Sequence, residues 1–404
     1  MARLNKTKGS KAPAWFAALI TTLLSLSAGA EINFTGYAKS FAIAQDSLDN
    51  DFISTPTIYQ SQNSLRLMLE GFGTSTVWQI HYELSPVLVS RDVGLPVQTF
   101  NVVGDSYRYS DIKSPIGNAD TKTEIYQNLD RFNVQFQFDA GDLTIGRQAI
   151  SFGSARMINP TDVFLPFDVQ TFNTEYRTGV DAIRFQRPVG ELGEIDLGIV
   201  LGPDADSETS AAFLQLRGNV SGNDLHFALI EYAEQSLIGA GLQRALGDFG
   251  FWFEAARVTG DQDYTRISTG LDYAFSEFTF GQIEYHYNGA GNDDPADYIA
   301  AAASLPYQRG GVFLYGRDYL IPSFSAQVSA LLSLSAAAII NLSDDSAFLN
   351  VAAEYNIAEN FYMDFGWYHF VGDDLNTNNL GLPELGSEYG TSPDMLYTSI
   401  RFYF

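Results

Sequence analysis

The chain has 404 residues, of which 48 are acidic and 23 are lysine or arginine, so its formal net charge is −25. Since nucleic-acid binding needs clustered basic residues, this balance excludes nucleic acid as a partner. The sequence contains no cysteine, which excludes disulfides, thiolate metal sites and a cysteine nucleophile.

The N-terminus has the organisation of a secretory signal peptide. Basic residues precede an apolar stretch from Ala14 to Leu26, and Ala28-Gly29-Ala30 offers a cleavage site before Glu31. The apolar stretch is short for a membrane span, which favours cleavage over the alternative of an N-terminal membrane anchor. We therefore assign residues 1–30 to a signal peptide and residues 31–404 to the mature domain.

Much of the mature chain alternates between apolar and polar residues with a period of two. In the clearest segment, Phe132 to Asp139, aromatic and aliphatic residues alternate strictly with polar ones. Such segments are about 10 residues long, against about 5–6 in soluble sheets, and their apolar faces are rich in aromatic residues. The pattern predicts an all-β fold: a transmembrane antiparallel up-and-down β-barrel of about 18 strands, with 16 as the alternative. The strands are expected at 32–43, 61–70, 75–87, 130–139, 142–150, 178–187, 193–201, 210–220, 224–233, 236–246, 249–259, 264–275, 277–287, 310–320, 324–341, 347–355, 361–370 and 395–404.

The lengths of the connectors support this assignment. Short turns follow the even-numbered predicted strands, whereas the long connectors, at 44–60, 88–129, 151–177, 288–309 and 371–394, follow odd-numbered ones. Bacterial outer-membrane barrels have short periplasmic turns and longer outer loops. Many acidic residues fall in these connectors, where we expect them to be solvated. A divalent cation that bridges them to lipopolysaccharide is the alternative.

The most unusual segment runs from Ile145 to Arg187. Its connector, 151–177, is too apolar for a solvated surface loop, with Met157, Ile158 and Phe164 close together. We expect this connector to fold into the barrel and narrow the pore. The alternative is an apolar outer loop that packs on its neighbours or in a subunit interface.

This segment resembles the 18-stranded, substrate-specific porin type represented by alginate-export channels. The resemblance lies in Gly146-Arg147-Gln148, in Ser151-Phe152-Gly153 and in Asp181-Ala182-Ile183-Arg184. It implies that arginines in the pore pair with the carboxylates of uronate sugars, which the guanidinium fork suits. The candidate constriction and substrate residues are Arg147, Arg156, Asp162, Arg177, Asp181 and Arg184. Arg147 shares the parity of Leu143 and Ile145, which predicts an outward side chain unless a bulge intervenes.

Catalysis has little support in the sequence. His81, His226, His286 and His369 lie on separate predicted strands without metal-ligand spacing, and no His–Ser pair is evident. We expect His286, between Tyr285 and Tyr287, to lie in the interfacial belt. No enzyme activity, metal site or cofactor is therefore predicted, and most interior charges are expected to form cross-strand ion pairs.

The C-terminus ends on an alternating strand, Leu396 to Phe404, with a terminal aromatic residue. It resembles the last strand of Gram-negative outer-membrane β-barrels. The resemblance implies recognition of Phe404 by the barrel-assembly machinery, and contact with outer-membrane lipid and lipopolysaccharide.

Together these features predict a porin in the cell outer membrane of a Gram-negative bacterium. It would pass small hydrophilic solutes by passive diffusion, with anionic sugars or organic acids as candidates. Three alternatives remain open: a hydrophobic-compound channel of the fatty-acid type, a structural or adhesion barrel with a closed lumen, and a barrel hydrolase.

Overall fold

The computed structural model of the protein describes residues 31–50, 52, 54–90, 107–120, 122–164, 175–377 and 383–404, with the backbone alone for 117–120. The predicted signal peptide, residues 1–30, lies outside the described residues.

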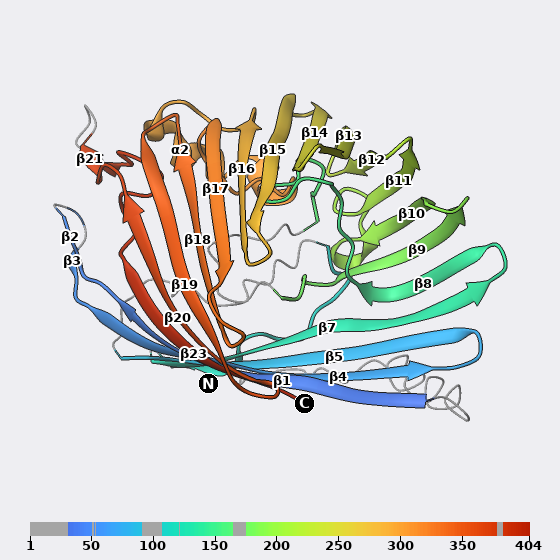
Figure 1. The fold of residues 1–404 in the computed structure, drawn as a ribbon, viewed down its shortest axis with the longest axis horizontal. Helices are drawn as coiled ribbons and strands as arrows, with labels where there is room; N and C mark the ends of the chain where they lie inside the picture. The colour runs from blue at the N-terminus through green and yellow to red at the C-terminus, as the bar shows by residue number, and fades with distance from the viewer. Residues whose placement is uncertain are drawn as a thin grey trace, which may run out of the picture.

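Antiparallel strands form one closed ring of 18 in the described part of the chain (Figure 1). β1 pairs with β23 from Tyr37↔Tyr403 to Gln45↔Met395, and this pairing closes the ring. A closed ring leaves no unpaired strand edge, as a lipid environment requires. In order around the ring, the strands are β1 (Glu31–Gln45), β4 (Ile58–Phe72), β5 (Thr76–Val89), β7 (Thr123–Phe138), β8 (Gly141–Gln148), β9 (Val180–Val189), β10 (Gly193–Leu201), β11 (Ala211–Val220), β12 (Asn223–Tyr232), β13 (Gln235–Leu246), β14 (Phe249–Gly260), β15 (Tyr264–Ser276), β16 (Thr279–Asn288), β17 (Asp318–Gln327), β18 (Leu332–Asn341), β19 (Ser346–Ala358), β20 (Phe361–Val371) and β23 (Met395–Tyr403).

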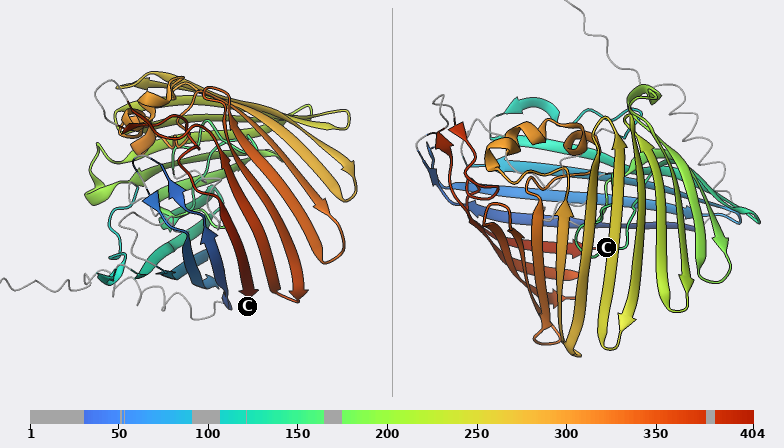
Figure 2. Two further views of the ribbon diagram at one scale, coloured as in Figure 1. Left: turned by 90° about the vertical axis from the view of Figure 1, so that its left-hand side faces the viewer. Right: turned by 90° about the horizontal axis from the view of Figure 1, so that it is seen from above.

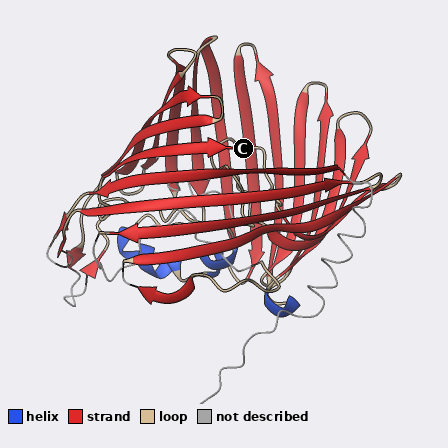
Figure 3. Ribbon diagram, turned by 90° about the horizontal axis from the view of Figure 1, so that it is seen from below, coloured by secondary structure: helices blue, strands red, loops and turns tan. Residues whose placement is uncertain are grey.

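The remaining elements are short and belong to the connectors. The helical elements gather at one rim of the barrel, and tight hairpin turns form the other (Figures 2 and 3). No helix in the described residues is long and apolar enough to cross a membrane. The short elements are β2 (Leu48–Asp49), β3 (Ser54–Thr55), β6 (Ile116–Asp120), η1 (Pro203–Ala205), η2 (Pro295–Asp297), α2 (Tyr298–Ala302), α3 (Leu305–Arg309), β21 (Asn376–Thr377) and β22 (Pro383–Glu384).

The two faces of the sheet differ in polarity, as β4 illustrates. Leu65, Leu67 and Leu69 are each more than a third exposed, whereas Ser64 and Arg66, which alternate with them along the strand, are buried. Successive residues of a strand point to opposite faces, so the apolar set faces outward and the polar set faces the interior. This is the arrangement of a transmembrane barrel, with an apolar band against lipid.

The predicted fold class and the count of 18 strands are confirmed, and the alternative of 16 is wrong. Two predicted strands, 310–320 and 324–341, are also wrong, because the structure has β17 at 318–327 and β18 at 332–341. The turn between them lacks glycine and asparagine. Instead the Ser329 hydroxyl accepts hydrogen bonds from the backbone N–H groups of Leu331 and Leu332, at 3.3 and 3.1 Å.

Residues 310–317 belong to the connector that follows β16. Val312 and Leu314 are buried, and the backbone N–H of Tyr315 donates to Glu388 at 2.9 Å. These apolar residues mimic a strand in the sequence because they pack inside the connector rather than against lipid.

Candidate functional site

The described parts of the connector between β8 and β9, residues 149–164 and 175–179, lie inside the barrel. Its described part begins at β8 and contacts Glu254 on β14 and Glu284 on β16, which lies almost half-way around the ring. Both carboxylates face the interior, since their neighbours Phe253 and Ile283 are exposed on the outer face. The contacts therefore place residues 154–161 against the interior wall opposite to β8.

Glu254 and Glu284 bind the backbone of this connector directly. Glu254 accepts hydrogen bonds from the N–H groups of Ser154, Ala155 and Thr161, the last two at 3.0 Å, and from the Thr161 hydroxyl at 2.7 Å. Chain without regular secondary structure must satisfy its N–H groups in some other way. Here a wall carboxylate accepts several of them at once.

Glu284 binds the next part of the same connector. It accepts the N–H groups of Arg156 and Met157 at 3.1 Å and of Ile158 at 2.9 Å. Trp252 on β14 donates its indole N–H to the same carboxylate at 2.8 Å. Glu284 therefore joins the connector to two strands of the wall.

The C-terminal part of the connector contacts the opposite arc of the ring. Glu175 forms ion pairs with Lys39 on β1 at 2.9 Å and with Arg401 on β23 at 3.2 Å. Tyr176 stacks on Tyr37 with ring centroids 5.8 Å apart, and the guanidinium of Arg66 lies 4.2 Å from its ring. The described parts of one connector thus touch β14 and β16 on one side and β1, β4 and β23 on the other.

Small residues and aromatic packing accommodate this route. A Cβ atom added to Gly239 or Gly241 on β13 would overlap Thr161 or Ser154. Phe152 and Phe164 pack edge-on against Phe213, which is buried on the interior face of β11. The apolar residues that made this connector unsuitable as a surface loop are therefore buried against the interior wall.

The structure brings Arg147 and Asp181 together. The Arg147 Nε and Nη2 atoms donate to Asp181 at 2.7 and 3.0 Å, and its Nη1 donates to Asp111 at 2.9 Å. Arg147 is buried, so it is not exposed to lipid as its parity predicts. Gly146 has φ +115°, a conformation that disturbs the regular pleat just before Arg147.

This cluster holds the connector before β7 in place. Burial opposes ionisation of Asp111, yet Arg108 and Arg147 keep the pKa of its carboxyl below the usual range. The Arg147 side chain also donates to the backbone oxygens of Ser110 and Leu129, at 2.7 and 2.9 Å. Its donors are therefore engaged by the protein itself, which gives Arg147 a structural role.

Asp162 and Arg177 form a second pair, inside the connector. Burial raises the pKa of Asp162 to about 6, although the neighbouring Arg177 acts in the opposite direction. Arg184 forms a third pair with Asp196 on β10, with contacts of 2.6 and 2.9 Å. The six predicted residues therefore do not form one ring of charges, because most of them are paired locally.

Arg156 is the exception. Its side chain is 49% exposed, whereas its partner Asp272, at 3.2 Å, is 13% exposed. The guanidinium lies 5.7 Å from the Trp252 ring. Among the six predicted residues, Arg156 is the cation that most openly faces the enclosed space.

Several interior residues were absent from the sequence-based candidates. They include Glu254, Glu284, Glu175 and Lys39, which hold the connector at both ends. Each is a single charge at an inward position of a strand or in a loop, a pattern that many structural residues share. A sequence signal for the residues on strands would be a charged residue on the polar face of one strand, opposite a small residue on a paired strand.

A histidine and a serine lie side by side, but not as a nucleophile pair open to substrate. Ser268 and His286 occupy paired positions of β15 and β16, with Oγ and Nδ1 2.8 Å apart. Both are fully buried, and the Ser268 hydroxyl contacts the Ile158 carbonyl at 2.6 Å. The expectation that His286 lies in the interfacial belt is wrong, since the connector covers it from inside. In the described ranges, no group of three or more acidic or histidine residues is placed to hold a metal ion.

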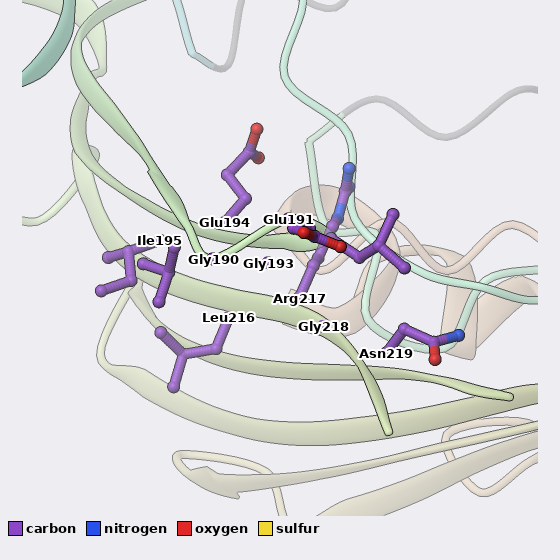
Figure 4. Close-up of a pocket in the computed structure, with 11 residues that line it drawn as sticks. Gly190, Glu191, Gly193, Glu194, Ile195, Leu216, Arg217, Gly218 and Asn219 are labelled. Carbon is purple, nitrogen blue, oxygen red and sulfur yellow. The ribbon is translucent and has the colours of Figure 1, made fainter. Parts of the chain in front are cut away.

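A cavity of about 670 Å³ opens at the rim formed by the short turns (Figure 4). It is lined by residues 189–195, in and beside the turn between β9 and β10, and by residues 216–219 of β11. Glu194 points to one side of the sheet, and Ile195 points to the other. The cavity lies where β10 begins, at Gly193, and where β11 approaches its end at Val220.

Comparisons with known proteins agree with the architecture. No protein-family model matches the chain, and no curated protein sequence matches it. Among solved structures, the chain is similar to Acinetobacter baumannii OccAB4, with 9% identity, 93% of this chain and 98% of that chain covered, and a TM-score of 0.55. It is also similar to Pseudomonas aeruginosa OccK5 (OpdH), with 8% identity, 93% and 98% coverage and a TM-score of 0.57. For the outer membrane protein OprD of Pseudomonas aeruginosa the values are 10%, 94%, 96% and 0.53. The chain therefore has the fold of these outer-membrane proteins, over nearly their whole length.

Proposed function

We propose that the protein is a channel of the Gram-negative outer membrane that passes small hydrophilic solutes by passive diffusion. The 18-stranded ring, its apolar outer face and the likeness in fold to outer-membrane proteins support the proposal. Lipid and lipopolysaccharide are then its surroundings, and no cofactor is required.

We infer further that the connector 151–177 narrows the pore. Its described parts contact opposite arcs of the interior wall, so they occupy part of the enclosed cross-section. A solute that passes the barrel must move between this connector and the wall. Narrow passages lined by charges of both signs select solutes by charge and orient dipoles.

The observation that carries the choice of solute is the half-exposed Arg156. It faces the enclosed space from the side of β14–β16, whereas Glu175 and Glu354, which are 32% and 45% exposed, lie near β23 and β19. A guanidinium with N–H groups still available to donate hydrogen bonds is well suited to bind a carboxylate. We therefore propose organic acids or anionic sugars as the solutes.

Bilayer recording tests both parts of this proposal. The purified protein should form steady conducting channels, and small carboxylates should reduce the ionic current at lower concentrations than neutral sugars of the same size. A barrel that inserts and does not conduct would contradict the channel. Equal effects of charged and neutral solutes would contradict the choice of solute alone.

Phe404 supports the proposed assembly. Its backbone N–H donates to Gly36 at 3.0 Å and its carbonyl accepts from Gly36 at 2.9 Å, so the terminal residue completes the closing pair of strands. Its ring lies 5.8 Å from that of Phe34. We propose that the barrel-assembly machinery recognises this terminal strand.

A further inference from the structure

Two wall carboxylates, Glu254 and Glu284, are buried without a cation. Both are 0% exposed, and neither forms an ion pair within the described residues. A buried carboxylate without a cation is unfavourable unless several donors satisfy it. Here the donors come from the connector: three backbone N–H groups reach each carboxylate.

The connector in turn depends on these two carboxylates for its hydrogen bonds. Residues 154–161 form no helix or strand, so their N–H groups have few partners of their own. Hydrogen bonds to an ionised acceptor are stronger than those between neutral groups. The two carboxylates accept six backbone N–H groups of this part of the connector, and Gln243, Arg266 and Ser268 bind its carbonyl oxygens.

We propose that Glu254 and Glu284 are positioning residues that fix the open cross-section of the pore. This inference rests on the proposed channel function. The two carboxylates hold residues 154–161 against β14–β16, and Glu284 also fixes the orientation of Arg156. It does so by binding the Arg156 backbone and the Trp252 indole, whose ring lies beneath the guanidinium.

Glu284 could affect the pore through its charge or as an attachment point for the connector, and the two roles have different consequences. If Glu284 acted only through its charge, its removal would shift the ionic selectivity and leave the geometry of the pore unchanged. If it acts as an attachment point, its removal releases the connector, so both the conductance and the current noise rise. The released connector would also become accessible to proteases, and Arg156 supplies a trypsin site within it.

The experiment compares Glu254→Ala, Glu284→Ala and the double variant with wild type and with Glu70→Ala. Glu70 is an interior carboxylate that binds Gln79 and His81 rather than the connector, so it is the matched control. Each variant is first checked for the heat-modifiable mobility of a folded barrel. Trypsin cleavage after Arg156 should accelerate about tenfold or more in the two Glu variants, and not in the control.

A rescue variant keeps the test decisive. The Ser154→Cys/Gly241→Cys pair would attach the connector to β13 through a disulfide, because the Ser154 Cβ lies 3.3 Å from a Cβ built on Gly241. In the Glu254→Ala background, oxidation should restore the wild-type conductance and the protection from trypsin. Reduction should return the conductance and the cleavage rate to those of Glu254→Ala. Should the Ala variants not fold, Glu254→Gln and Glu284→Gln take their place.

The outcomes distinguish this inference from the channel proposal. Protection from trypsin that is equal in wild type and Ala variants overturns the positioning role, whether or not the barrel conducts. A wild-type barrel that does not conduct, while its Ala variants lose protection, overturns the channel and leaves the attachment established.

Discussion

Replacement of Arg156 by alanine should make the pore more selective for cations. The wild-type side chain is half exposed and pairs with Asp272 at 3.2 Å. Its removal takes away a positive charge that faces the enclosed space and leaves the carboxylate of Asp272 without its partner. Both changes raise the free energy of a passing anion and lower that of a passing cation.

The size of the effect follows from Coulomb's law. An ion that passes about 6 Å from the lost charge changes its energy by about 0.7 kcal/mol in bulk water and about 3 kcal/mol at an effective dielectric constant of about 20. Because Arg156 is half exposed, the lower value applies. Because the anion and the cation change by this amount in opposite directions, the ratio of their permeabilities changes by about tenfold. The ion lies within the Debye length at about 0.1 M salt.

The assay is the reversal potential of single channels in a potassium chloride gradient. The ratio of potassium to chloride permeability should rise about tenfold in Arg156→Ala, with a smaller shift at high salt. Arg244→Ala is the control, since Arg244 is exposed on β13 beside Gln243, whose side chain faces the connector. An unchanged ratio in Arg156→Ala would refute the placement of Arg156 in the permeation path.

Three further predictions concern assembly, the connector and pH. Deletion of Phe404 should reduce the amount of heat-modifiable barrel in the membrane, because two closing hydrogen bonds to Gly36 are lost; normal amounts would contradict this. Gly239→Val should displace Thr161 and raise the current noise, whereas Gly218→Val, with no atom near an added Cβ, should not. Burial raises the pKa of Asp162 to about 6, so the protonated form is favoured by the folded connector. Its stabilising contribution is complete below the usual aspartate pKa and is lost as the pH rises through about 6. Current noise should therefore fall from about pH 7 to about pH 5 in wild type and stay constant in Asp162→Asn.

The sequence predicted the barrel well because the period of two is a local property. Each strand must present one apolar face to lipid, so segments such as Phe132 to Asp139 carry the signal by themselves. The prediction was wrong where residues are apolar for a reason other than contact with lipid. Val312 and Leu314 pack inside a connector, and the turn at Ser329 uses a side-chain acceptor instead of glycine.

The candidate site could be predicted only in part, because its contacts join residues far apart in the sequence. Asp181 pairs with Arg147 across adjacent strands, and a motif can suggest such a pair. The contact of Glu284 with Ile158 spans 126 positions, and no local pattern marks it. Arg147 is buried by residues 108–111 of another connector, which a count of parity does not take into account.

A single disulfide tests whether the connector between β8 and β9 lies against β13 inside the barrel and limits the pore. The chain has no cysteine, so Ser154→Cys/Gly241→Cys has one possible intramolecular pair. The Cβ atoms would lie 3.3 Å apart before relaxation, near the range of about 3.5–4.5 Å for disulfides. Oxidation of the folded barrel should form this disulfide nearly completely, lower the current noise and leave the conductance close to that of wild type. Free thiols that persist in a folded, conducting barrel under oxidation would contradict it.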